Sequence, residues 1–181
     1  TSLVNMDGNR YTLAILDELR REGGLTARVK VPFHYKPDMT LADLDEASAM
    51  HRDYADDWLT SGFVKLFMDG VLDSGTAFRL DRDDAGPLFS DADFARIATE
   101  IDRRGLQIAV HAIGDGAVRQ TLNGFAAART ANGARDSRHR IEHIEMITRE
   151  DVPRLIDLGV TASLQPSHAP GAMDFDLDST L

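Results

Sequence analysis

The chain has 181 residues, of which 43% are hydrophobic and 28% are charged, a composition typical of one globular domain with a hydrophobic core. Its net charge of −10 argues against a broad basic surface, so neither nucleic acid nor an anionic membrane is an expected partner. The lack of cysteine excludes disulfides, thiolate zinc sites and a cysteine nucleophile, and leaves histidine, carboxylate or a modified lysine as ligands for any metal.

Neither a transmembrane helix nor a targeting signal is predicted. No window of about 18 residues is continuously apolar, and the first residues carry neither a basic region nor an apolar signal core. We therefore expect a cytoplasmic protein. The chain also starts without methionine, inside a strand-like segment, and we expect it to be an internal piece of a longer protein.

Strand-like and helix-like hydrophobic patterns alternate along the chain. Short apolar runs predict the strands, and apolar residues spaced three and four apart predict the helices, several of which end at a glycine. In chain order, the predicted elements are a strand at 1–5, a helix at 11–22, a strand at 28–34, a helix at 41–50, a strand at 63–68, a helix at 91–101, a strand at 106–111, a helix at 115–131, a strand at 140–145, a helix at 148–158 and a strand at 160–165.

Strict alternation of strands and helices predicts parallel strands joined by right-handed crossovers, which leaves a doubly wound sheet or part of a (β/α)8 barrel. Polar groups at the ends of several strands favour the barrel. A complete barrel typically needs about 250 residues, so we expect residues 1–181 to form a single partial barrel domain. The segment 69–90 is a loop rich in glycine and aspartate, and so long a loop in a compact domain is usually functional.

Three polar residues, Lys65, His111 and His143, lie in predicted strands whose other residues are mostly apolar. A buried lysine is costly unless it is paired, modified or bound to a ligand. Taken singly, each histidine is more often a hydrogen-bonded core or surface residue than a metal ligand. Three such groups at the ends of three consecutive strands favour a metal site, because imidazoles bind Zn, Fe, Co and Ni and a carbamate of lysine can join them.

Four segments carry a more specific signal. They are Phe63–Ala77 (FVKLFMDGVLDSGTA), Val110–Asp115 (VHAIGD), Arg138–His143 (RHRIEH) and Gly159–Ala169 (GVTASLQPSHA). In this order they resemble the successive motifs of the amidohydrolase superfamily, and the most similar branch is the amidohydrolase family 3 group that includes N-substituted formamide deformylases. The resemblance covers nearly the whole chain.

The resemblance implies a metal-bearing (β/α)8 barrel of which the chain supplies roughly strands two to seven. It places Lys65 at a position that is carboxylated in many members and bridges two metals, and His111 and His143 at the positions of histidine ligands. One or two divalent cations are implied, with zinc the expected metal. The first-strand His-x-His pair and the last-strand aspartate, which acts as general base, are expected outside residues 1–181, so the chain alone is expected to be inactive.

The implied reaction is hydrolysis of an amide-type, non-peptide C–N bond of a small-molecule substrate by a metal-activated water. The aspartate of the last strand would transfer the proton. Two alternatives stay open at this point: a non-catalytic α/β domain that binds small molecules, and a phosphoester hydrolase on the same barrel.

Several residues that follow or end predicted strands are candidates for supporting roles. We expect Asp69, Gln165 and His168 to contact substrate. Glu142 either pairs with an outer helix or orients a metal ligand. Asp115 is expected to cap the helix that it opens, with an orienting role beside the metal as the alternative.

The remaining histidines and the tryptophan have simpler expected roles. His34 ends the predicted strand at 28–34 and is expected to line the barrel interior. His51 and His139 are expected on helix and loop surfaces, and Trp58 is expected to be a packing residue.

A piece of a barrel that lacks its first and last strands has two unpaired sheet edges. Unpaired edges offer free backbone N–H and C=O groups to other chains and invite association. We therefore expect homo-oligomers or edge-paired association of this chain.

Overall fold

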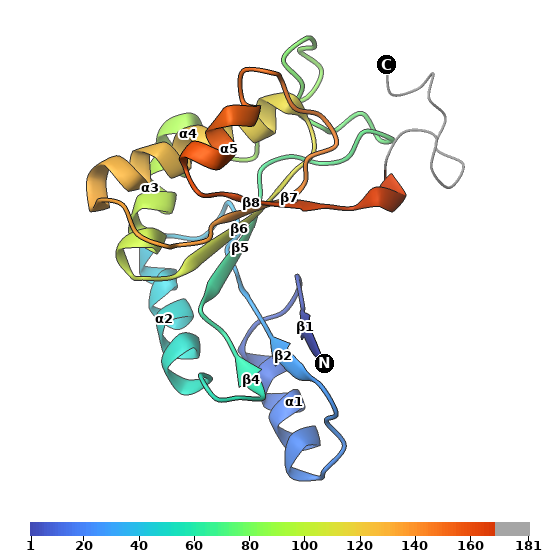
Figure 1. Ribbon diagram of the computed structural model, residues 1–181, viewed down its shortest axis with the longest axis vertical. Coiled ribbons are helices and arrows are strands. Elements are labelled where there is room, and N and C mark those ends of the chain that lie inside the picture. The colour runs from blue at the N-terminus through green and yellow to red at the C-terminus, as the bar shows by residue number, and fades with distance from the viewer. Residues whose placement is uncertain (169–181) are drawn as a thin grey trace.

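The computed structural model describes residues 1–168, in which strands alternate with helices (Figure 1). The strands are β1 (Ser2–Val4), β2 (Arg28–Lys30), β3 (Phe33–His34), β4 (Leu59–Thr60), β5 (Phe63–Phe67), β6 (Gln107–Ala112), β7 (Arg140–His143) and β8 (Thr161–Leu164). The helices are α1 (Arg10–Arg21), α2 (Leu44–Asp53), α3 (Asp91–Arg103), α4 (Asp115–Asn132) and α5 (Val152–Asp157), with 3-10 turns η1 (Leu41–Asp43) and η2 (Pro166–His168). Within this part of the chain, no helix has the length and apolar character needed to cross a membrane.

The strands form two sheets with the orders β1-β2-β4 and β3-β5-β6-β7-β8, and all pairings between these strands are parallel. The predicted α/β class with a parallel sheet is thus confirmed. The sheets are joined because β2 leads into β3 and β4 leads into β5 after two residues each. Neighbouring strands therefore follow the order of the chain, as they do in a barrel.

Two bends mark where the chain passes from one sheet to the other. The predicted single strand at 28–34 is divided at Pro32, which has no N–H to donate to a neighbouring strand. Gly62 bends the second passage with a φ of +99°, which favours glycine. A Cβ at Gly62 would also lie 2.6 Å from Nδ1 of His51. The short strand β4, before Gly62, was not predicted.

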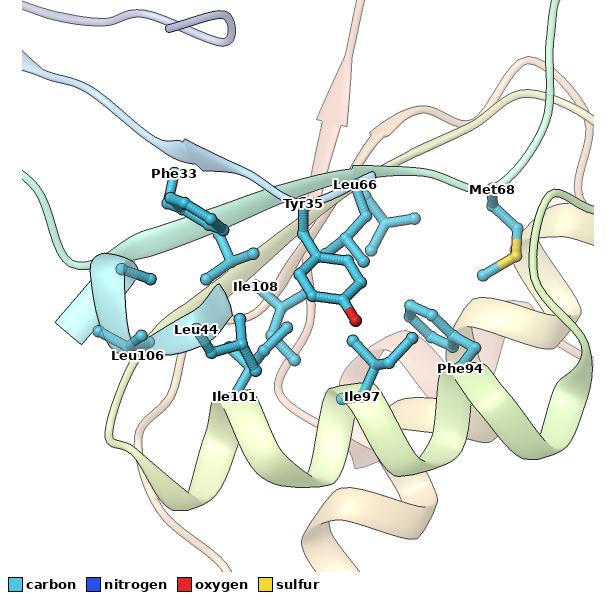
Figure 2. Packing of buried hydrophobic residues seen from close by; sticks show 14 of the residues in the cluster. Phe33, Tyr35, Leu44, Leu66, Met68, Phe94, Ile97, Ile101, Leu106 and Ile108 are labelled. Carbon is cyan, nitrogen blue, oxygen red and sulfur yellow. The ribbon is translucent and has the colours of Figure 1, made fainter. Parts of the chain in front are cut away.

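The helices cover one face of the five-stranded sheet. α2 packs on β5, and α3 and α4 pack on β6. The buried strand residues Leu66 and Ile108 lie in the same layer as Ile97 and Ile101 of α3 (Figure 2). Because side chains alternate along a strand, the residues between these apolar positions project from the opposite face.

The opposite face of the five-stranded sheet carries most of the candidate functional groups. Parallel pairing places His34 next to Lys65, and it places Phe67 next to His111 and His111 next to Glu142. Lys65 and Phe67 are two residues apart and so share this face. In a closed barrel, this face would line the interior.

The loop 69–90 is anchored to the turn between β6 and α4. The buried Asp69 carboxylate accepts hydrogen bonds from three backbone N–H groups, those of Ile113 (3.0 Å), Gly114 (2.8 Å) and Phe78 (3.0 Å). A Cβ at Gly114 would lie 2.0 Å from the Phe78 carbonyl oxygen, so this close approach requires glycine. The loop is therefore held against the carboxyl end of β6.

Two expectations about surface and core are wrong. His139, expected on a loop surface, is only 6% exposed. It is buried because its Nδ1 accepts a hydrogen bond from the Ile108 N–H (3.0 Å) and its Nε2 lies 3.1 Å from Oδ1 of Asp102. Trp58, expected to pack, is 43% exposed, since it lies in the turn before β4 where its backbone N–H bonds to Asp56.

Candidate metal centre

Five rings form a continuous row across the carboxyl ends of the strands. In order, they are His34 of β3, Phe67 of β5, His111 of β6, His143 of β7 and His168 of η2. Neighbouring ring centroids are 5.3, 4.8, 4.5 and 5.6 Å apart, respectively. Imidazoles from elements far apart in the sequence therefore meet at the edge of the sheet where barrels carry their catalytic groups.

The backbone at the end of β7 aims the His143 ring at His111. Because His111 pairs with Glu142, a regular strand would point His143 toward the face covered by helices. His143 and Ile144 instead have φ values of +77° and +54°, in the left-handed region that is unfavourable for residues with a Cβ. Backbone strain of this kind costs about 1–3 kcal/mol per residue and is common at functional sites.

Hydrogen bonding determines the tautomer of His111. Its Nε2 lies 2.8 Å from the backbone carbonyl oxygen of Gly70, and because a carbonyl only accepts, Nε2 carries the proton. Burial lowers the pKa of His111 to about 4, so the ring is neutral near neutral pH. Nδ1 then keeps its lone pair. A metal-binding histidine typically has this arrangement, with its other nitrogen donating to a backbone carbonyl.

His143 has a buried nitrogen whose hydrogen-bonding capacity is unused. Its Nδ1 is inaccessible to solvent and has no hydrogen-bond partner among the described residues. Leaving a buried polar atom unsatisfied costs about 1–3 kcal/mol. Burial lowers the pKa of His143, and the charge of Lys65 lowers it further, so the neutral form that binds metals is favoured. Both histidines therefore fit the role of metal ligands.

Lys65 is buried on the same face of the sheet. Its Nζ donates a hydrogen bond to the Leu66 carbonyl oxygen (3.0 Å) and lies 3.8 Å from the centroid of the Phe67 ring. Burial lowers the pKa of Lys65 to about 8, so part of the amine is neutral near neutral pH. Beside the larger effect of burial, the Lys65 charge lowers the pKa of His111 and of His143, as expected for groups that lie close together.

Glu142 faces the same interior as His111, so pairing with an outer helix is ruled out for it. Its buried carboxylate accepts hydrogen bonds from Nε (2.5 Å) and Nη2 (3.0 Å) of Arg140, and Arg140 also donates to Oγ of Ser163 (2.8 Å). The ion pair lies within β7, and the hydrogen bond from Arg140 to Ser163 links β7 with β8. The negative charge of Glu142 also raises the pKa of Lys65, in opposition to the larger effect of burial.

Asp69 and Asp115 hold the long loop to the sheet. Burial raises the pKa of Asp69 to about 6, although three backbone N–H groups bond to its carboxylate, and its Oδ1 lies 3.7 Å from Nε2 of His111. Asp115 was expected to cap α4, but Gly114 occupies the N-cap position and Asp115 is the first residue of the helix. The Asp115 carboxylate accepts hydrogen bonds from the Leu80 N–H of the loop (2.9 Å) and from the Gly116 N–H in the first turn of α4 (2.9 Å). Both carboxylates thus act on loop backbone.

Gln165 and His168 lie beside His143 at the end of β8. Gln165 raises the pKa of His143 as a minor effect beside that of burial, and Nδ1 of His168 lies 3.0 Å from Oε1 of Glu145. Sequence reasoning did not single out Glu145. Its only signal was its place two residues after His143, which is weak in a chain with 30 acidic residues.

Comparisons with known proteins agree on one family. The model of the amidohydrolase family, in its family 3 branch, matches residues 1–179. The chain is 35% identical over 118 residues to Protein LONG AFTER FAR-RED 3 of Arabidopsis thaliana, which covers 62% of this chain and 20% of that protein. It is 30% identical over 111 residues to the amidohydrolase YtcJ of Bacillus subtilis (strain 168), covering 58% of this chain and 20% of that protein. The chain thus spans about a fifth of the length of these relatives.

Solved structures of two metal-dependent hydrolases have a similar fold. The proteins from Pyrococcus horikoshii and Pyrococcus furiosus superpose on this chain with TM-scores of 0.70 and 0.69, each at 28% sequence identity. Each superposition covers 92% of this chain and 33% of the other, which is consistent with a partial barrel. A family match over nearly the whole chain, together with this fold, shows that the chain belongs to the amidohydrolase family.

Proposed function

We propose that this chain is the central part of a metal-dependent hydrolase that cleaves amide-type, non-peptide C–N bonds in a small-molecule substrate. Family membership and the metal-dependent hydrolases of similar fold support hydrolysis with a divalent cation. The observation that carries the proposal is the pair His111 and His143, whose ring centroids lie 4.5 Å apart. N-substituted formamides are the first substrate class to test, because the four sequence motifs resemble those of that branch.

In this proposal His111, His143 and Lys65 hold one or two divalent cations, with zinc as the first candidate. A cation bound there would lower the pKa of water toward neutrality and polarise the carbonyl of the substrate. His111 would bind through Nδ1, because the Gly70 carbonyl oxygen holds the proton on Nε2 and orients the ring. His143 would contribute the buried Nδ1 that has no hydrogen-bond partner among the described residues.

Lys65 is proposed to act as a carbamate. Its low pKa supports this, since only a neutral amine reacts with carbon dioxide and burial lowers the pKa of Lys65 to about 8. Native mass spectrometry in bicarbonate buffer should show one added CO2 per chain, absent in Lys65→Met and retained in the exposed control Lys36→Met. An unmodified chain, or one modified equally in the Lys65→Met protein, would contradict the carbamate.

The proposal also expects the proton-transferring aspartate and a His-x-His pair in a longer polypeptide, outside residues 1–181. Residues 1–181 would then bind metal weakly and catalyse nothing by themselves. We further propose that the enzyme works in the cytoplasm, which cell fractionation would test.

Metal analysis and hydrolysis assays of the longer polypeptide test the proposed function. We expect one or two divalent cations per chain and hydrolysis of N-substituted formamides or other small amides. His111→Asn and His143→Asn should lose metal and lower kcat/KM by about a hundredfold or more, whereas the exposed control His51→Asn should keep both. Activity on phosphoesters but not on amides, or full activity of His111→Asn, would refute the proposal.

A further inference from the structure

Two side chains outside the predicted ligand set, Glu145 and His168, lie close to the predicted ligand His143 at the end of β7. His143, Glu145 and His168 each offer one ligand atom, and these atoms lie within 4.8 Å of one another. The rings of His143 and His168 are nearly parallel, with an interplanar angle of 13° and centroids 5.6 Å apart. We propose that His143, Glu145 and His168 form a divalent-cation site of their own, built from two imidazoles and one carboxylate.

The distances within the trio formed by His143, Glu145 and His168 suit a metal ion. Oε1 of Glu145 and Nδ1 of His168 are 3.0 Å apart. Metal–ligand bonds of about 2.0–2.1 Å in tetrahedral geometry separate two ligand atoms by about 3.3 Å. These two residues are therefore already spaced as ligands, and the ligand atom of His143 lies within 4.8 Å of both. Imidazole with carboxylate is a donor set that Zn, Co, Ni and Fe(II) accept.

A simple ion pair does not explain the whole arrangement. The side chain of Glu145 is 13% exposed and that of His168 is 39% exposed, so their contact by itself is a partly solvated pair. It leaves the buried Nδ1 of His143 without a hydrogen-bond partner among residues 1–168. A cation between the three groups would use that nitrogen and would also fix η2 against the end of β7.

The trio shares His143 with the proposed function but requires neither Lys65 nor His111. Because a neutral imidazole has one free lone pair, His143 would hold the cation of the trio or that of the proposed catalytic centre, and not both at once. The site could therefore exist whether or not the longer polypeptide is a hydrolase, and it can be tested on residues 1–181 by metal binding alone.

Titration of the chain with cobalt(II) tests the trio, since visible absorption of the bound ion reports its coordination geometry and calorimetry reports its affinity. Glu145→Gln and His168→Asn should each weaken cobalt binding by about tenfold or more and change the spectrum. The matched exposed controls Glu150→Gln and His51→Asn should bind as the wild type does. Thermal unfolding of each variant establishes that it is folded. If His168→Asn does not fold, the result for Glu145→Gln decides the test.

The outcomes separate this site from the proposed catalytic centre. Cobalt binding that depends on Glu145 and His168 but survives Lys65→Met and His111→Asn supports the trio. Binding that is lost in Lys65→Met and His111→Asn but kept in Glu145→Gln overturns the trio and leaves the proposed function standing. A wild-type chain that binds no cobalt also overturns the trio.

Discussion

Protonation of the buried His139 is predicted to destabilise the fold in mild acid. Its Nδ1 accepts the Ile108 N–H, so in the neutral ring Nε2 carries the proton and donates it to Asp102. A proton added to Nδ1 would face the Ile108 N–H, break that hydrogen bond and leave a charge inside the protein. The Asp102 carboxylate, which also accepts from Asn132 and Arg135, partly offsets the cost.

The size and sign of the effect follow from the pKa of His139. Burial lowers this pKa from 6.5 to about 4, and the charge of Arg135 also lowers it, while Asp102 raises it. The unfolded chain therefore binds more protons than the folded chain between these two pH values. The stabilisation is complete above pH 6.5 and is lost as the pH falls through about 4. Over this interval the loss for His139 is about 3 kcal/mol.

Urea unfolding between about pH 7 and pH 4.5 measures this loss as a difference between proteins. The free energy of unfolding of the wild type should fall with pH more steeply than that of His139→Gln, which has no titrating ring. His139→Gln should itself be less stable at neutral pH, since the buried Ile108 N–H loses its acceptor. The other histidines of lowered pKa add the same pH dependence to the free energy of unfolding of both proteins, so their effect cancels in the difference. The exposed His51→Gln serves as control. Equal pH dependence of wild type and His139→Gln would refute the reasoning.

Three further predictions concern packing, charge and association. Gly114→Ala should destabilise the chain by about 3 kcal/mol or more in thermal unfolding, because its Cβ would lie 2.0 Å from a carbonyl oxygen of the long loop. The control Gly86→Ala should not destabilise it, since a Cβ there meets nothing within 4 Å. Equal melting temperatures of the two variants would contradict this prediction. Arg140→Gln leaves the buried Glu142 carboxylate without its cation and should cost about 3 kcal/mol in urea unfolding, so a change below about 1 kcal/mol would count against it. We also propose that chains pair through the β8 edge, where Leu164 is 62% exposed. Light scattering should show oligomers of the wild type and fewer oligomers of Leu164→Lys. A monomeric wild type would disprove this pairing.

The α/β architecture could be predicted because it depends on local patterns. Leu66 and Ile108 are apolar at alternating positions of strands that helices cover, and this pattern is visible in the sequence. The division of the strand at Pro32 follows from the missing N–H and could also have been anticipated. The strand β4 could not, because two residues carry too little periodicity to distinguish a strand from a turn.

The burial of His139 could not be predicted, because its partners are distant in the chain. Asp102 and Ile108 lie 37 and 31 positions away from it. Its neighbours in the sequence are polar, which is why the sequence predicts an exposed loop. The same limit applies to Glu145, whose link to His168 spans 23 positions and depends on how η2 folds back.

The sequence by itself determined which strands carry polar side chains among apolar residues, and so placed Lys65, His111 and His143 as candidate metal ligands. Only the tertiary structure decided how these groups are aimed. Strand pairing alone would turn His143 toward the helices, and a left-handed φ of +77° turns it toward His111. Such a conformation is unfavourable for the isolated chain, so it arises only where the packed sheet and loops enforce it.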